Sequence, residues 1–259
     1  AAMRLRLLAL TLGLSLAALG VSCSSADDTD TDTASPTTTE ATADTTVTTA
    51  SDADGSQDTE AAGTPVTFVA EVWADNWFSL YVNGELVGED SVPITTERSF
   101  NAETIEFEAT YPLTLGVVSK DFKETDSGLE YIGTDRQQMG DGGLIVQVTD
   151  ASTGEVVAVS DGTWRGLAIQ QAPLDTECET SADPDAECES TTQAEPDGWN
   201  EADFDDADWE DATVYTAEQV QPKEGYDTIA WDPSAALIWT SDLEVDNTIL
   251  WRATVEAPA

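Results

Sequence analysis

Short segments in which apolar and polar residues alternate recur from Thr64 onward, and this pattern restricts the fold more than any other feature of the chain. In Thr104–Ala109 the alternation is strict, which predicts a strand with one face in the core and the other in water. Asn83-Gly84 separates two apolar runs and favours a β-hairpin, because a type I′ turn requires a positive φ at both positions. No segment has a sustained helical period, apart from a single turn near Ala217–Val220. The sequence therefore predicts an all-β fold.

Turn sequences rich in Gly, Asp and Ser separate these segments, for example Asp126-Ser127-Gly128 and Thr153-Gly154. Strands at this spacing are typical of an antiparallel β-sandwich or barrel. The expected strands cover residues 66–72, 78–82, 86–88, 105–109, 113–119, 144–149, 155–160, 164–170, 212–215, 237–239 and 248–255.

Four segments resemble, in order, parts of the galactose-binding-like jelly rolls. These domains include the sugar-binding domains of family 2 glycoside hydrolases and the N-terminal domains of bacterial α-L-rhamnosidases. Residues 74–88 resemble their early hairpin, and Asp161-Gly162-Thr163-Trp164 is similar to their Asp-x-x-Trp turn. Residues 198–209 resemble their Gly-Trp…Phe-Asp-Asp-x-x-Trp turn, and residues 249–255 match their closing strand.

The resemblance covers residues 66–256 and implies an antiparallel jelly roll over residues 65–259. It also implies carbohydrate as the ligand class, although many such domains bind nothing and only brace a neighbouring catalytic domain. Only four residues follow Val255, so we expect no catalytic barrel to be attached.

The first 22 residues have the pattern of an export signal. Arg4 and Arg6 precede a mostly apolar run over residues 7–21, which is too short for a comfortable bilayer span. Small residues then precede Cys23, as in the bacterial lipobox, in which the cysteine is acylated and becomes the new amino terminus. We expect residues 1–22 to be a lipoprotein signal peptide and Cys23 to hold the chain at the cell membrane or cell surface. The alternative is a plain secreted protein in which Cys23 is incidental.

Residues 24–64 consist mainly of Ser, Thr, Ala, Asp and Glu. Between Ser24 and Gly63 there are ten acidic residues and no basic one. With so little apolar surface to bury, this segment cannot offset the entropy of ordering. We therefore expect a disordered acidic tether over residues 23–64, beginning at the lipidated cysteine and extending away from an anionic surface.

The charge excludes several classes of function. The chain has 52 acidic and 9 basic residues, no histidine, and a formal charge of -43. Such a field repels phosphate backbones and anionic lipids, so we expect no nucleic-acid partner and no membrane contact except through the lipid anchor. Mechanisms that need an imidazole are excluded as well. The composition still allows three possibilities: carboxylate chemistry, binding of a hard cation, or no catalysis. Because the sequence contains no catalytic motif, we expect that the protein is not an enzyme.

Two further cysteines, Cys178 and Cys188, lie in an acidic insertion at about residues 175–197. With Cys23 acylated, they are the two thiols left in an exported, oxidising setting, which favours a disulfide between them. A thiolate metal site is disfavoured because no histidine can complete the ligand shell.

Calcium is the cofactor that this composition could accommodate, because carboxylates in turn-rich loops are ligands for hard cations. The densest group of candidate ligands is Asp203, Asp205, Asp206 and Asp208. The alternative is a solvated acidic loop in which the aspartates only shape a turn.

Eight tryptophans suggest an aromatic platform that stacks on a sugar ring. The candidates for carbohydrate binding are Trp77, Tyr81, Asn83 and Trp199, with a core position as the alternative for each aromatic residue. The sequence thus predicts a surface-tethered, non-catalytic domain that binds carbohydrate weakly. The alternative function is a structural or protein-interaction domain that docks on an envelope partner and binds no sugar.

Overall fold

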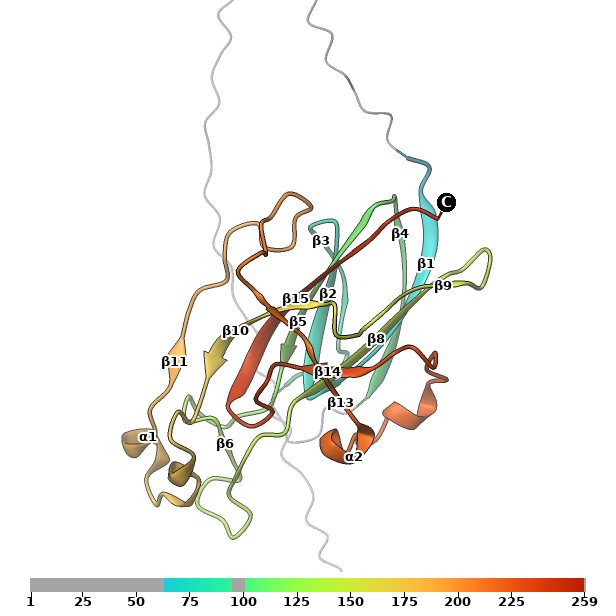
Figure 1. Ribbon diagram of the computed structural model, residues 1–259. Helices are drawn as coiled ribbons and strands as arrows, with labels where there is room; N and C mark the ends of the chain where they lie inside the picture. The colour runs from blue at the N-terminus through green and yellow to red at the C-terminus, as the bar shows by residue number, and fades with distance from the viewer. Residues whose placement is uncertain (1–62, 95–100, 259) are drawn as a thin grey trace, which may run out of the picture. The chain divides into compact units, whose positions relative to one another are not determined.

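A computed structural model describes residues 63–94 and 101–258. The expected signal peptide, Cys23 and nearly all of the tether lie outside the described residues. Within the described part, most of the regular structure is β, and all the strand pairs are antiparallel (Figure 1). The predicted all-β class is therefore confirmed.

Two large sheets form the fold. The six-stranded sheet contains β13 (Thr213–Tyr215), β14 (Leu237–Trp239), β8 (Gly143–Asp150), β1 (Val66–Asp75) and β4 (Ala102–Ala109) in this order, and β9 (Val156–Val159) pairs with β8. The seven-stranded sheet contains β11 (Thr191–Thr192), β10 (Arg165–Gln171), β15 (Asp246–Val255), β5 (Leu113–Lys120), β2 (Trp77–Val82) and β3 (Glu85–Glu89), and β12 (Glu210–Asp211) pairs with β10.

The smaller elements lie in the connections. A two-stranded hairpin joins β6 (Leu129–Glu130) to β7 (Gln138–Met139). The helical segments are η1 (Thr176–Thr180), α1 (Pro184–Glu187), α2 (Ala217–Val220) and η2 (Tyr226–Thr228). Of the helices in the described ranges, none has the length and apolar character needed to cross a membrane.

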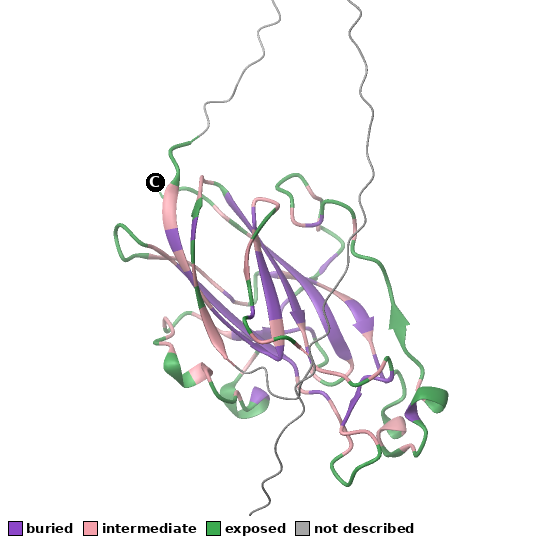
Figure 2. Ribbon diagram, turned by 180° about the vertical axis from the view of Figure 1, so that it is seen from behind, coloured by how far each residue is buried: buried purple, intermediate pink, exposed green. Residues whose placement is uncertain are grey.

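The main core lies between the two sheets. Phe68, Ala70 and Val72 of β1 are completely buried and belong to the same cluster as Leu80 of β2 and Trp251 of β15. This arrangement follows from the period of two in the sequence, since alternate side chains of a strand point to the same face. Figure 2 shows the buried residues concentrated in the strands of both sheets, whereas α1 and α2 are largely exposed.

Two smaller clusters cover the outer faces of the sheets. Trp199 and Trp209 pack over Val118 and Leu250 of the seven-stranded sheet. On the six-stranded sheet, Val220 of α2 belongs to a cluster with Trp73, Ile145 and Leu237. The cover formed by Trp199 and Trp209 explains why β5, in the seven-stranded sheet, is buried over almost its whole length and is not alternately exposed.

The hairpin predicted at Asn83-Gly84 is confirmed. Both residues have positive φ, 51° and 85°, as a type I′ turn requires. The side chain of Asn83 strengthens the turn: its Oδ1 accepts a hydrogen bond from the backbone N of Thr114 at 2.7 Å, and its Nδ2 donates one to the carbonyl of Thr110 at 3.2 Å. The positive φ and the two side-chain hydrogen bonds together explain why asparagine is suited to position 83.

The acidic insertion is closed by the predicted disulfide. The sulfur atoms of Cys178 and Cys188 lie at bonding distance, with the two Cα atoms 5.6 Å apart. The bridge joins the short η1 segment to the residue that follows α1. It therefore links two elements that bury little apolar surface of their own.

Candidate functional site

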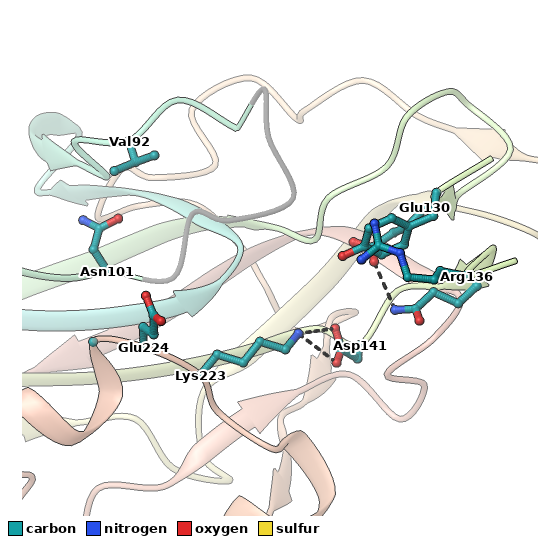
Figure 3. Close-up of a pocket in the computed structure, with 10 residues that line it drawn as sticks. Val92, Asn101, Glu130, Arg136, Asp141, Lys223 and Glu224 are labelled. Carbon is teal, nitrogen blue, oxygen red and sulfur yellow. Dashed lines mark hydrogen bonds and ion pairs between the residues drawn. The ribbon is translucent and has the colours of Figure 1, made fainter. Parts of the chain in front are cut away.

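A pocket of about 830 Å³ opens between the β6–β7 hairpin and the segment that precedes η2. Figure 3 shows Glu130 and Arg136 on one side of it, Val92 and Asn101 on another, and Lys223 beside Asp141. Most of the lining side chains are polar or charged: Asn101, Glu130, Tyr131, Arg136, Gln138, Asp141, Lys223 and Glu224. The pocket can therefore offer hydrogen-bond donors and acceptors together.

Lys223 connects the pocket to the acidic residues beneath it. Its Nζ lies 3.1 Å from Oδ2 and 3.3 Å from Oδ1 of Asp141. The same ammonium lies 3.3 Å from Oδ2 of Asp75, whose side chain is completely buried, whereas Lys223 itself is partly exposed. Burial lowers the pKa of Lys223, but Asp75 and Asp141 raise it by more, so the ammonium stays protonated at neutral pH.

Three carboxylates meet at this point. Asp75, Asp121 and Asp141 each contribute one carboxylate oxygen, and these three oxygens lie within 4.8 Å of one another. Asp75 and Asp121 are 0% and 2% exposed, and each has one oxygen, Oδ1, without a hydrogen-bond partner in the described structure. Two of the three carboxyl groups are thus buried with an unsatisfied acceptor.

Burial and mutual repulsion shift the pKa values of the two buried groups. Burial raises the pKa of Asp75 to about 8, with a further increase from Asp141 and an opposing effect of Lys223. The pKa of Asp121 is also raised well above its ordinary value, first by burial and then by Asp75 and Glu130. Without a further cation, these carboxyl groups therefore retain protons at pH values where an exposed aspartate is ionised.

The pairing of the strands brings these three residues together. Asp75 ends β1, and it pairs with Gly143 at the start of β8, so Asp141 lies just beyond the same end of the sheet. The backbone N of Asn76 donates to the carbonyl of Lys120 at 2.8 Å, which places Asp75 beside Asp121 at the end of β5. The site thus lies where ends of the two sheets meet.

Gly140 makes room for the buried carboxylate of Asp121. A Cβ atom at this position would lie 1.5 Å from Oδ2 of Asp121. Any larger residue would displace that carboxylate, so the glycine-rich turn at residues 140–143 shapes the site as well as reversing the chain.

Of the residues predicted to bind carbohydrate, the structure buries Trp199, whereas Trp77, Tyr81 and Asn83 are half-buried. Trp199 is 5% exposed, stacks on Trp209 with ring centroids 6.4 Å apart, and contacts the edge of Tyr81. Trp77 is half-buried, and the Nζ of Lys120 lies 4.7 Å from its ring centroid. The structure thus brings Tyr81 and Trp199 together, while the Asn83 side chain bonds the backbone beside its turn.

The structure does not bring the predicted calcium ligands together. Oδ2 of Asp206 accepts a hydrogen bond from Nε of Arg252 at 2.8 Å, and Oδ1 of Asp205 accepts one from the backbone N of Ala207. Asp203 and Asp208 are exposed. Among the described residues, the group of carboxylates that converges is the one at Asp75, Asp121 and Asp141.

Sequence reasoning missed this convergence. Asp75 lies within the segment that resembles the jelly-roll hairpin, but Asp121 and Asp141 lie outside all the segments quoted for that resemblance. The available signal was positional: each of the three acids stands at the end of, or just outside, a predicted apolar strand.

Comparison of the chain with protein-family models, curated proteins and solved structures returned no match.

Proposed function

We propose that residues 65–259 form a galactose-binding-like jelly roll that binds carbohydrate without catalysis, and that the ligand enters the pocket between the β6–β7 hairpin and Lys223. The observation that carries this proposal is the dense set of donors and acceptors around one open cavity. Sugar hydroxyl groups both donate and accept hydrogen bonds, so such a lining suits them. The ordered contact between Nε2 of Gln138 and Oε2 of Glu130, at 3.1 Å, holds part of the lining in place before a ligand arrives.

The pocket favours hydrogen bonding over stacking. Tyr131 is an aromatic residue in the lining, and the guanidinium carbon of Arg136 lies 3.8 Å from its ring centroid. One face of the ring is therefore covered by a cation. We expect weak binding, at roughly micromolar to millimolar dissociation constants, because a few hydroxyl contacts must offset the entropy of association.

The charge of the protein restricts the ligand. With a formal charge of -43, a uronic-acid or sulfated polymer would meet a repulsive surface. Neutral or cationic saccharides are the favoured class.

Catalysis is less well supported than binding. The carboxyl groups with the most strongly raised pKa values, Asp75 and Asp121, would be candidates for a glycosidase acid. They are 0% and 2% exposed and do not line the pocket, so a sugar bound there would not contact them. The pocket therefore offers binding groups at its surface and keeps its unusual acids away from a substrate.

Docking on an envelope protein finds less support among the described residues. The large apolar side chains with high exposure are Leu86, Leu174 and Val214. They lie on β3, on the loop after β10 and on β13, and so do not share one element. A partner-binding surface built on apolar contact would need a contiguous patch.

We propose that the protein is an exported bacterial lipoprotein anchored through Cys23. The export pattern of residues 1–22 supports this, and the Cys178–Cys188 disulfide is consistent with an oxidising compartment. In bacteria that express the full chain, Cys23→Ala should move the protein from the detergent phase to the aqueous phase. Partitioning that does not change would refute acylation at this cysteine.

A glycan array tests the binding proposal. We expect the full chain with Cys23→Ala, which removes the proposed acylation, to bind neutral or amino sugars in preference to uronic acids. An array without any reproducible signal, together with capture of the chain by a defined envelope protein, would favour the docking alternative.

A further inference from the structure

We propose that Asp75, Asp121 and Asp141 form a calcium site at the edge of the pocket, and that the ion takes the place now held by the ammonium of Lys223. Asp141 and Lys223 also line the pocket, but the inference does not depend on carbohydrate binding, because it rests on the arrangement of the three carboxyl groups.

The first argument is the geometry of the oxygen atoms. Calcium binds oxygen ligands at about 2.3–2.6 Å, so ligands around one ion lie up to roughly 5 Å apart. One oxygen from each of the three aspartates lies within 4.8 Å of the other two, which fits ligation of a single ion. Magnesium usually keeps several of its waters and is bound through one or two carboxylates, so a set of three protein carboxylates suits it less well.

The second argument is independent of clustering and concerns unsatisfied atoms. Oδ1 of Asp75 and Oδ1 of Asp121 are buried without a hydrogen-bond partner. Buried carboxylates are normally paired, hydrogen-bonded or bound to a metal ion. Asp121 donates its backbone N to the carbonyl of Asn247, and Oδ1 of this buried asparagine also lacks a partner. An amide oxygen is a further ligand type that calcium accepts.

The third argument is the local charge. Three carboxyl groups meet here, and the cation that lies between Asp75 and Asp141 is a single ammonium. A divalent ion would compensate this charge better than one ammonium and would satisfy the oxygens that accept no hydrogen bond.

Lys223 is suited to leave when an ion enters. Its side chain is 38% exposed, and its flexible stem extends along the pocket. When calcium binds, the ammonium would move toward the pocket and its solvent. Zinc is disfavoured because the chain has no histidine and because Cys178 and Cys188 are joined in a disulfide.

Calorimetric titration of the EDTA-treated full chain with calcium chloride, at constant ionic strength, tests the proposal. We expect one saturable site in the unmodified chain. Asp121→Asn should weaken the affinity at least tenfold, and Lys223→Met should strengthen it because the competing ammonium is absent. The control is Asp205→Asn, an exposed acid in the loop at residues 203–208, and it should leave the affinity unchanged.

Asp141→Asn provides a second test if Asp121→Asn does not fold, since the Asp141 side chain is 41% exposed. It too should weaken calcium binding at least tenfold. An absence of saturable binding in the unmodified chain would overturn the site, and so would equal affinity in the site variants and the control. Unchanged or weaker binding in folded Lys223→Met would overturn the displacement of Lys223 by the ion.

Discussion

The ammonium of Lys223 lies 3.3 Å from Oδ2 of Asp75, and the Asp75 side chain is completely buried. Lys223 follows α2 and Asp75 ends β1, so this ion pair connects the cover of the six-stranded sheet to the sheet itself. Removing Lys223 would take the hydrogen-bond donor away from the buried Oδ2 of Asp75 and leave this polar group without that partner, which is costly.

Lys223→Met should therefore destabilise the protein in the presence of EDTA. We expect a loss of about 1–3 kcal/mol, less than for a fully buried pair because Lys223 is partly exposed. The matched control is Lys123→Met, whose partner Asp126 has a side chain that is 85% exposed, and this variant should lose less than about 0.5 kcal/mol. Urea unfolding measures both, and equal losses would contradict a special role for Lys223.

Removing the disulfide should lower stability and keep the fold. In the loop-entropy model, a bridge across this short loop stabilises by roughly 2.5–3 kcal/mol, less if strained. We expect Cys178→Ser/Cys188→Ser to lose up to that amount and to retain the far-UV circular dichroism of the unmodified chain. Since η1 and α1 contribute little to the core, collapse of the whole sandwich would show that the insertion has a larger structural role.

Trp199 should behave as a core residue. Its ring packs between Tyr81 and Trp209, so Trp199→Ala should cost about 3–5 kcal/mol. Trp77→Ala, at a half-buried position, should cost clearly less. Thermal unfolding compares the two, and a fully stable Trp199→Ala that no longer binds a glycan would restore the platform predicted from the sequence.

Asp90 should make stability depend on pH. Burial raises its pKa to about 6, and the neighbouring Glu103 adds to this increase. The folded state thus binds the proton more tightly than the unfolded state, so this contribution is complete below pH 4 and is lost as the pH rises through 6. Between pH 4 and pH 7.5 the free energy of unfolding of the unmodified chain should fall by at most about 3 kcal/mol more than that of the Asp90→Asn variant. Parallel stability curves for the two proteins would contradict the shift.

The strands were largely predictable because their pattern is local. Alternation identified Phe68, Ala70 and Val72 as one inward face, and the turn chemistry of Asn83-Gly84 identified the hairpin. The β6–β7 hairpin was missed because strands of two residues, such as Leu129–Glu130, show no alternation.

The candidate site was not predictable in the same way, because its residues are far apart in the chain. Only the antiparallel pairing of β1 with β8, and the contact of Asn76 with Lys120, brings Asp75, Asp121 and Asp141 together. Density along the chain was misleading: the aspartates at residues 203–208 are adjacent in sequence, but they do not converge. The role of Trp199 was ambiguous because a core and a sugar platform both favour tryptophan. The structure distinguishes the two roles, because it packs Trp199 with Trp209 over the seven-stranded sheet.

The most direct test of the account is calorimetric titration of the best array glycan into the full chain carrying Cys23→Ala and into pocket variants of it. Gln138→Ala and Arg136→Ala remove lining groups, while Gln193→Ala, an exposed glutamine outside the pocket, is the control. The account predicts at least tenfold weaker binding in both pocket variants and unchanged binding in the control. Equal affinity in all of these proteins would contradict carbohydrate binding at this pocket.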